Sequence, residues 1–182
     1  MAPIPFRGFN EYGDVRLYDH GILPHWRQVG CSYFVTFRLA DSIPQSVLRS
    51  WNDERDRWLA DHDISTSSPN WKGQLRGLPL TLRRTYEREF GKRIDDCLDR
   101  GSGSCLLGLP DQRTVVLNAL THFHEQRVWT GDYVVMPNHV HVILRPMPGF
   151  ELEDLLHSIK SYTAHALNRL SGESGTVWQR ES

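Results

Sequence analysis

The sequence predicts an α+β fold in which an antiparallel sheet carries helices on one face. A first strand is followed, after a long helical segment, by a helix, two strands that Pro137-Asn138 separates, and a long amphipathic helix. This order is most of the ferredoxin-like β-α-β-β-α-β pattern. We therefore expect a single domain over residues 1–182, with a helical insertion at 41–113 after the first strand.

Composition limits the class of protein before any element is assigned. With 182 residues, 39% of them hydrophobic, the chain is long enough for one sizeable core. It has no apolar run of about 18 residues, so we expect no membrane span, and its start does not resemble a secretory signal. The odd number of cysteines and their spacing indicate a reducing cytoplasm: Cys31, Cys97 and Cys105.

Charge does not decide the partner. The net charge is −1, although only three of the 21 basic residues are lysines. Arginine suits bidentate contacts with phosphate and stacking on bases. A genome rich in G and C also enriches arginine over lysine, so both explanations stay open.

The N-terminal half predicts one strand and one clear helix. Residues 1–30 hold several prolines and glycines and are expected to be irregular. Residues 31–39, Cys-Ser-Tyr-Phe-Val-Thr-Phe-Arg-Leu, are aromatic and β-branched, which predicts a strand. The segment from Pro44 to Asp63 predicts a helix, because proline suits the first turn and apolar residues recur with helical spacing.

The rest of the insertion alternates between expected loops and helices. We expect a loop at 64–79, a second helix at 80–100 that is broken or strained at Gly91, and a loop at 101–111. Helical periodicity returns at 113–127.

Two strands then carry the most informative spacing. Residues 128–136 and 139–146 predict antiparallel strands joined at Pro137-Asn138. Side chains alternate along a strand, so His139, His141 and Arg145 share one face while Val140, Val142 and Leu144 share the other. The two imidazoles could then reach one ion or one phosphate; alternatively, they are two polar residues on a solvated face. His122 and His124 lie in the preceding helical pattern, where this spacing does not allow a shared ligand.

The long helix at 150–170 places a tyrosine at the edge of its apolar stripe. Tyr162 lies on the same flank as Ser158, His165 and Arg169. A tyrosine in such a position is commonly a packing residue with its hydroxyl in water. A phenol becomes a useful nucleophile towards a phosphate only if a cation polarises the target. Residues 176–182 are expected to be a loop or the start of a last strand.

Three separated blocks resemble a known family. "LPHWRQVGCSYFVTFRLADSIP", "MPNHVHVIL" and "SIKSYTAHALNRLSGESGTVWQRES" occur in that order and resemble the single-tyrosine HUH transposases, in particular the REP-associated tyrosine transposases. The resemblance covers residues 23–44 and 105–182, while residues 45–104 match only loosely.

The resemblance implies a function in DNA transposition and recombination. His139 and His141 would bind Mg²⁺ or Mn²⁺, and Tyr162 would attack a phosphodiester of single-stranded DNA to leave a 5′-phosphotyrosine and a free 3′-OH. The DNA would carry a hairpin of a REP-like or element-end sequence. The protein would be a monomer or homodimer in the bacterial cytoplasm, associated with the nucleoid when bound to DNA.

The chain departs from the family pattern at the third metal ligand. Ala166 occupies that position and cannot coordinate, so His165 is the replacement candidate. Relatives also continue past "WQRES" with a further strand, so we expect an unpaired sheet edge. The expected contacts with DNA are four cationic side chains: Arg145, Arg38, Lys160 and Arg169. The alternatives are a catalytically decayed or domesticated binder of structured single-stranded DNA and a phosphoesterase that acts through activated water.

Overall fold

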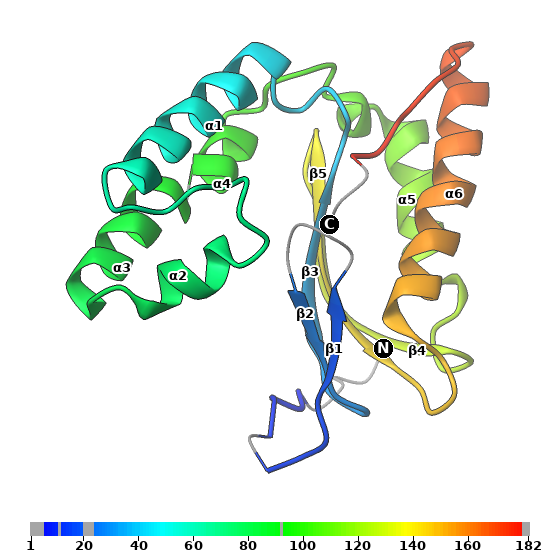
Figure 1. Cartoon of the computed structure of the whole chain (residues 1–182). Helices are drawn as coiled ribbons and strands as arrows, with labels where there is room; N and C mark the ends of the chain where they lie inside the picture. Colours follow the sequence, from blue (N-terminus) through cyan, green and yellow to red (C-terminus); the bar gives the residue numbers. More distant parts are fainter. Residues whose placement is uncertain (1–5, 11, 20–23, 92, 180–182) are drawn as a thin grey trace. The chain divides into compact units, whose positions relative to one another are not determined.

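A computed structural model describes residues 6–10, 12–19, 24–91 and 93–179 (Figure 1). Its contacts divide the chain into two compact units. The first unit combines residues 1–40 with residues 105–182, and the second consists of residues 41–104.

The first unit is built on a three-stranded antiparallel sheet. Its strands are β3 (Tyr33–Arg38), β4 (Val128–Val135) and β5 (His139–Pro146), in the order β3-β5-β4. The predicted turn at Pro137-Asn138 joins β4 to β5, and the Met136 amide donates to the His139 carbonyl across it at 2.9 Å. Strands β4 and β5 therefore have the predicted bounds to within a residue.

Two helices cover one face of this sheet. Figure 1 shows α5 (Pro110–His122) and α6 (Leu152–Ser171) side by side on that face. Proline occupies the first turn of α5, where its missing N–H costs nothing. Alternate residues of β3 and β5 join apolar residues of both helices in one core, which includes Val35, Phe37, Val140, Val142, Leu144, Leu120, Leu155, Ile159 and Leu167.

The free edge of β3 carries a single bridge to the end of the described chain. Leu39 pairs antiparallel with Trp178, the Ala40 amide donates to the Val177 carbonyl at 2.8 Å, and the Gln179 amide donates to the Arg38 carbonyl at 2.9 Å. A ferredoxin-like sheet has its last strand at this edge. The described residues form only this bridge there, so the mixed helix-and-strand class is confirmed, while the complete ferredoxin-like order stays a prediction.

The expectation that residues 1–30 are irregular is wrong. Within them β1 (Arg16–Asp19) and β2 (Pro24–Arg27) form a separate antiparallel pair. Strands of four residues are too short to show alternation, and a proline at the first position of an edge strand interrupts no ladder. Arg27 at the end of β2 donates to Glu153 in the first turn of α6 at 2.7 Å, which ties the pair to the first unit.

The second unit consists of helices and the loops between them. They are α1 (Gln45–Ala60), α2 (Trp71–Gly77), α3 (Leu80–Tyr86), a π-helix at Glu87–Gly91 and α4 (Arg93–Asp99). The π-helix confirms the predicted irregularity at Gly91. The predicted loop at 64–79 is wrong because it contains α2, whose Trp71 is half-buried with the Arg55 guanidinium 5.8 Å from its ring.

The bounds of the predicted helix at 113–127 also differ from those observed. Helix α5 begins at Pro110 and ends at His122, and His124 to Arg127 form a turn. Glu125 lies in this turn with a φ of 62°, in the left-handed region, and a right-handed helix cannot continue through such a residue. In the part of the chain that is described, no helix has the length and hydropathy needed to cross a membrane.

Candidate metal and DNA site

The two histidines of β5 converge on each other. The Nε2 atoms of His139 and His141 are 2.9 Å apart, and the rings lie at 82° with their centroids 4.6 Å apart. The strand places both side chains on the face opposite α5 and α6, because Val140 between them belongs to the core. The spacing of two residues on a strand is what allows the two ring nitrogens to meet.

A second contact orients each ring. His139 Nδ1 lies 2.8 Å from Oδ1 of Asn138, which is buried and belongs to the turn after β4. His141 Nδ1 lies 2.8 Å from the hydroxyl of Thr36, which is the residue directly opposite on β3. Ring nitrogens that are not ligands are held in this way in metal sites, where the partner fixes the ring and its tautomer.

The contacts define one consistent proton arrangement for the neutral pair. The Asn138 oxygen only accepts, so His139 Nδ1 carries the hydrogen and His139 Nε2 has a lone pair. His141 Nε2–H then donates to it, and His141 Nδ1 accepts from the Thr36 hydroxyl. A cation on both Nε2 atoms requires the His141 hydrogen to move to Nδ1. The Thr36 hydroxyl can then turn and accept, because a hydroxyl serves as donor or acceptor.

The distance between the ring nitrogens also fits a shared ion. Two histidine nitrogens bound tetrahedrally to one zinc ion, with bonds of about 2.0–2.1 Å, lie about 3.3 Å apart, so the two rings need to separate only slightly to hold an ion. Among the described residues no group of three or more His, Cys, Asp or Glu side chains could hold a metal ion. The pair could therefore supply two ligands, and the remaining positions would go to water or to oxygen atoms of a substrate.

An exposed apolar strip and two arginines surround the imidazoles. Phe34 on β3 is 67% exposed and Val134 on β4, directly opposite His141, is 51% exposed. Arg38 faces His139 across the β3–β5 ladder, and Arg145 lies further along the same face with its guanidinium 5.6 Å from the Trp129 ring. The face thus combines nitrogen ligands, cationic side chains and an aromatic ring.

Tyr162 lies in a different part of the first unit. Its side chain is 61% exposed on α6 and lines a pocket of about 350 Å³ with residues of α5 and α6: Asn118, Ala119, His122, Phe123, Ser158 and Ile159. Because these helices cover the other face of the sheet, one chain does not bring Tyr162 together with the histidine pair. His165 is exposed on the same helix. The roles of both residues stay predictions.

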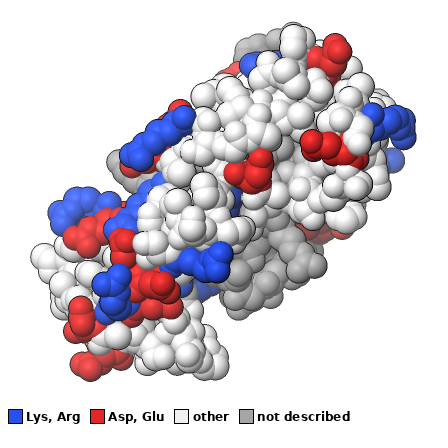
Figure 2. All heavy atoms as spheres, turned by 90° about the horizontal axis from the view of Figure 1, so that it is seen from above, with Lys and Arg blue, Asp and Glu red and all other residues white. Residues whose placement is uncertain are grey.

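The predicted DNA contacts divide between the two faces. Arg38 and Arg145 share the histidine face, whereas Lys160 and Arg169 belong to α6. Lys160 Nζ donates to the Gln179 carbonyl at 2.6 Å, and burial lowers its pKa. Figure 2 shows basic and acidic side chains interspersed on the face that it presents, so charge alone marks no DNA surface there.

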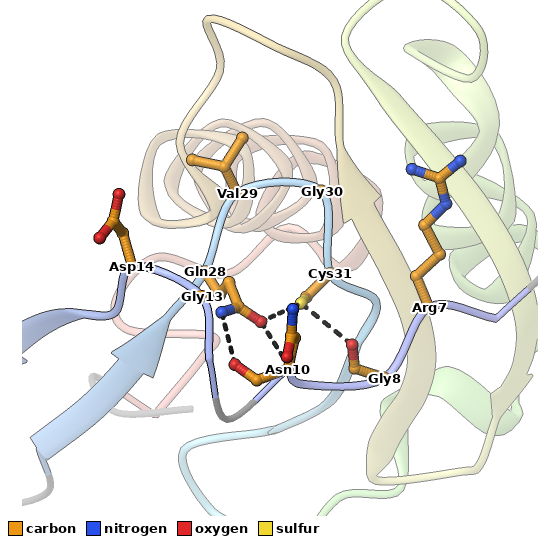
Figure 3. A pocket seen from close by; sticks show the side chains of 9 residues that line it. All are labelled: Arg7, Gly8, Asn10, Gly13, Asp14, Gln28, Val29, Gly30 and Cys31. Atoms are coloured by element: carbon orange, nitrogen blue, oxygen red, sulfur yellow. Dashed lines mark hydrogen bonds between the residues drawn. The ribbon is translucent and has the colours of Figure 1, made fainter.

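Another pocket, of about 390 Å³, lies where the N-terminal segment meets the residues just before β3 (Figure 3). The Gln28 side chain accepts from the Asn10 amide at 2.7 Å and donates to the Asn10 carbonyl at 2.9 Å. The buried Cys31 thiol contacts Gln28 Oε1 at 3.1 Å and the Gly8 carbonyl at 3.3 Å. These bonds hold the segment to the sheet, which indicates a structural role.

Sequence reasoning missed three residues of the histidine face. The sequence predicts only a turn at Asn138 and only strand positions at Thr36 and Phe34. Alternation places Thr36 and Phe34 together, opposite the core residues Val35 and Phe37. The register between β3 and β5 is needed to place them beside His141, and a single sequence does not contain it.

The comparison with known families agrees with the resemblance. Residues 118–181 match the family model described as Transposase IS200 like. This range includes β4, β5 and α6, and therefore both histidines and Tyr162. The predicted resemblance to the single-tyrosine transposases is thus confirmed over this range, and it indicates a transposase-type, DNA-processing function. No curated protein and no solved structure matches the chain.

Proposed function

We propose that this protein is a metal-dependent single-stranded DNA endonuclease and strand transferase that acts on hairpin-bearing DNA. One observation supports this most directly: the 2.9 Å approach of His139 Nε2 to His141 Nε2, with each Nδ1 held by a separate partner. A divalent cation there would polarise a phosphodiester and stabilise the charge that develops during displacement. Mg²⁺ and Mn²⁺ both take mainly oxygen ligands, which phosphate and water would supply beside the two imidazoles. Of the two ions, only Mn²⁺ belongs to the transition-metal series that also binds nitrogen ligands, so it is the better candidate for this pair.

The chemistry needs a nucleophile, for which Tyr162 is the candidate. Its phenolic oxygen forms a bond with phosphorus, the bond to the 3′ oxygen breaks, and the phenolic proton passes to the leaving 3′ oxygen directly or through water. The products are a 5′-phosphotyrosine and a 3′-OH, and attack by a 3′-OH reverses the step without ATP. Because Tyr162 and the histidines lie on different layers of one chain, we propose that a second copy supplies Tyr162.

A denaturing gel tests this function. A labelled hairpin oligonucleotide with Mn²⁺ should give a cleaved strand and a covalent protein–DNA adduct, and EDTA should abolish both. The variants Tyr162→Phe and His139→Ala should each form no adduct. A mixture of the two should form it on the His139→Ala chain, which a size tag identifies. An adduct that persists in Tyr162→Phe excludes this nucleophile.

The position of Tyr162 also favours a second function, non-catalytic binding of structured single-stranded DNA. In that case the same gel shows no product, while hairpin binding is present and weakens with salt. A cleaved strand without an adduct would instead indicate attack by an activated water.

A further inference from the structure

The aromatic ring of Phe34 lies directly against the candidate cation site. Its centroid is 5.3 Å from that of His141, and the planes are 15° apart, which is a stacked arrangement. Phe34 pairs in register with Ile143, so its contact with His141 runs diagonally across the β3–β5 ladder. Diagonal neighbours on one face are within reach of aromatic side chains.

Packing of the core does not explain why β3 carries an aromatic side chain at Phe34. The core side of β3 is formed by Val35 and Phe37, exposed by 7% and 1%, whereas Phe34 is 67% exposed. Val134 is also half-exposed on the other side of His141. Exposed apolar residues are common singly, but here they flank the imidazoles in a strip.

We propose that Phe34 is the platform on which an unpaired nucleobase stacks, next to the phosphate bound at the histidine pair. This inference rests on the proposed function and adds the residue that positions the nucleotide. Single-stranded nucleic acid is commonly held by aromatic stacking beside cationic groups that contact the backbone. Phe34 contacts His141 and still exposes most of its surface, so a base can reach it from the nucleotide whose phosphate is at the imidazoles.

The chemistry of the neighbours selects a nucleobase over an apolar protein segment. A protein partner that covered Phe34 and Val134 would also bury His141 and the two arginines of this face, Arg38 and Arg145. Burying such groups without matched partners is costly. A nucleotide provides an apolar ring for Phe34 and an anionic phosphate for the polar groups. Because every base has a π-face, the platform should be tolerant of sequence.

An abasic scan tests this platform. The probe is a fluorescein-labelled hairpin oligonucleotide with a single-stranded flank, and one abasic nucleotide is moved through the flank. Binding is measured by anisotropy with Mn²⁺ in the full-length Tyr162→Phe protein. One abasic position should weaken binding on the order of tenfold. Adding Phe34→Ala should weaken binding of the intact oligonucleotide by a similar factor. In that variant, the abasic nucleotide at the sensitive position should cause no further loss of affinity.

Matched variants distinguish a loss of base stacking from a general loss of affinity for the oligonucleotide. Phe34→Trp should keep the affinity, whereas Phe34→Leu, which keeps an apolar side chain without a ring, should lose it. Tyr12→Ala removes an aromatic ring of the N-terminal segment that is 90% exposed, and it should leave the affinity unchanged. If the oligonucleotide binds and all abasic penalties persist in Phe34→Ala and Phe34→Leu, the platform is wrong and the proposed function stands. If the parent protein binds no oligonucleotide, both fail together.

Discussion

The two faces of β5 differ in what contacts each side chain more than in burial. Val140, Val142 and Leu144 are fully buried against the helices. On the other face His139 is also buried, at 1% exposure, but its ring nitrogens contact Asn138 and His141. One strand therefore supplies apolar contacts to the helix layer on one face and a chain of polar contacts on its other face.

This difference shows how eight residues can serve stability and chemistry separately. Apolar burial stabilises in proportion to area and tolerates many partners. A buried imidazole needs each nitrogen satisfied, so its partners fix its position and tautomer. Substitutions on the two faces should consequently change different observables: the free energy of unfolding on the helix face, and cation binding on the histidine face.

The largest expected effect is on the helix face. Leu144→Ala should lower the free energy of unfolding by about 3 kcal/mol, because it removes a fully buried side chain and leaves a cavity. Ile143 precedes Leu144, lies on the other face and is half-buried, so Ile143→Ala should lower the free energy of unfolding by only about 1 kcal/mol. Urea denaturation of both variants measures the comparison. Equal losses would mean that the two faces do not differ in this way.

The next effect is on the histidine face. Mn²⁺ should raise the melting temperature of the parent protein, since an ion at 100 times its dissociation constant adds about 2.7 kcal/mol of stability. His141→Ala should abolish this rise because one of two protein ligands is lost. His157→Ala, which removes an exposed histidine of α6, is the matched control and should keep it. A rise that survives His141→Ala would place the ion elsewhere.

A smaller loss of Mn²⁺ affinity is expected when the hydrogen-bond partner of His141 is changed and His141 itself is kept. Thr36→Val keeps the shape of the side chain but removes the hydroxyl that lies 2.8 Å from His141 Nδ1. Loss of such an outer contact commonly weakens metal binding by about 10- to 100-fold. Thr36→Ser keeps a hydroxyl and should restore much of the affinity in a Mn²⁺ titration. If Thr36→Val binds Mn²⁺ like the parent, the hydroxyl does not orient His141.

The same two faces explain what the sequence could predict. Alternation in β5 and the helical period of α6 come from local geometry, so the strands, the long helix and the shared face of His139 and His141 follow from the residues alone. The pairing of β1 with β2 is local, but strands of four residues are too short to show alternation. The half-buried position of Trp71 in α2 depends on packing with another helix, because its ring lies near Arg55 of α1. The partners of His141 likewise depend on register, and the separation of Tyr162 from the pair depends on which face α6 covers.

The smallest expected effect concerns a cation in the helix layer. Burial lowers the pKa of Lys160, so between this lowered value and the ordinary value of about 10.4 the unfolded chain binds more protons than the folded chain. The contribution of Lys160 to stability should therefore increase as pH rises through that window and decrease as pH falls through it. Lys160→Met removes the titration and keeps an unbranched apolar stem. The free energy of unfolding of the parent relative to this variant should increase with pH in urea denaturation.

The same variant also tests the boundary between the two faces. Lys160 Nζ donates to the Gln179 carbonyl, next to the Leu39–Trp178 bridge, so we expect it to anchor the terminal segment rather than contact DNA. Hairpin affinity should change little in Lys160→Met and fall in Arg145→Met, because only Arg145 shares the face of the histidines. An equal loss of hairpin affinity in both variants would mean that DNA also contacts the helix layer, so DNA binding would not be confined to the histidine face.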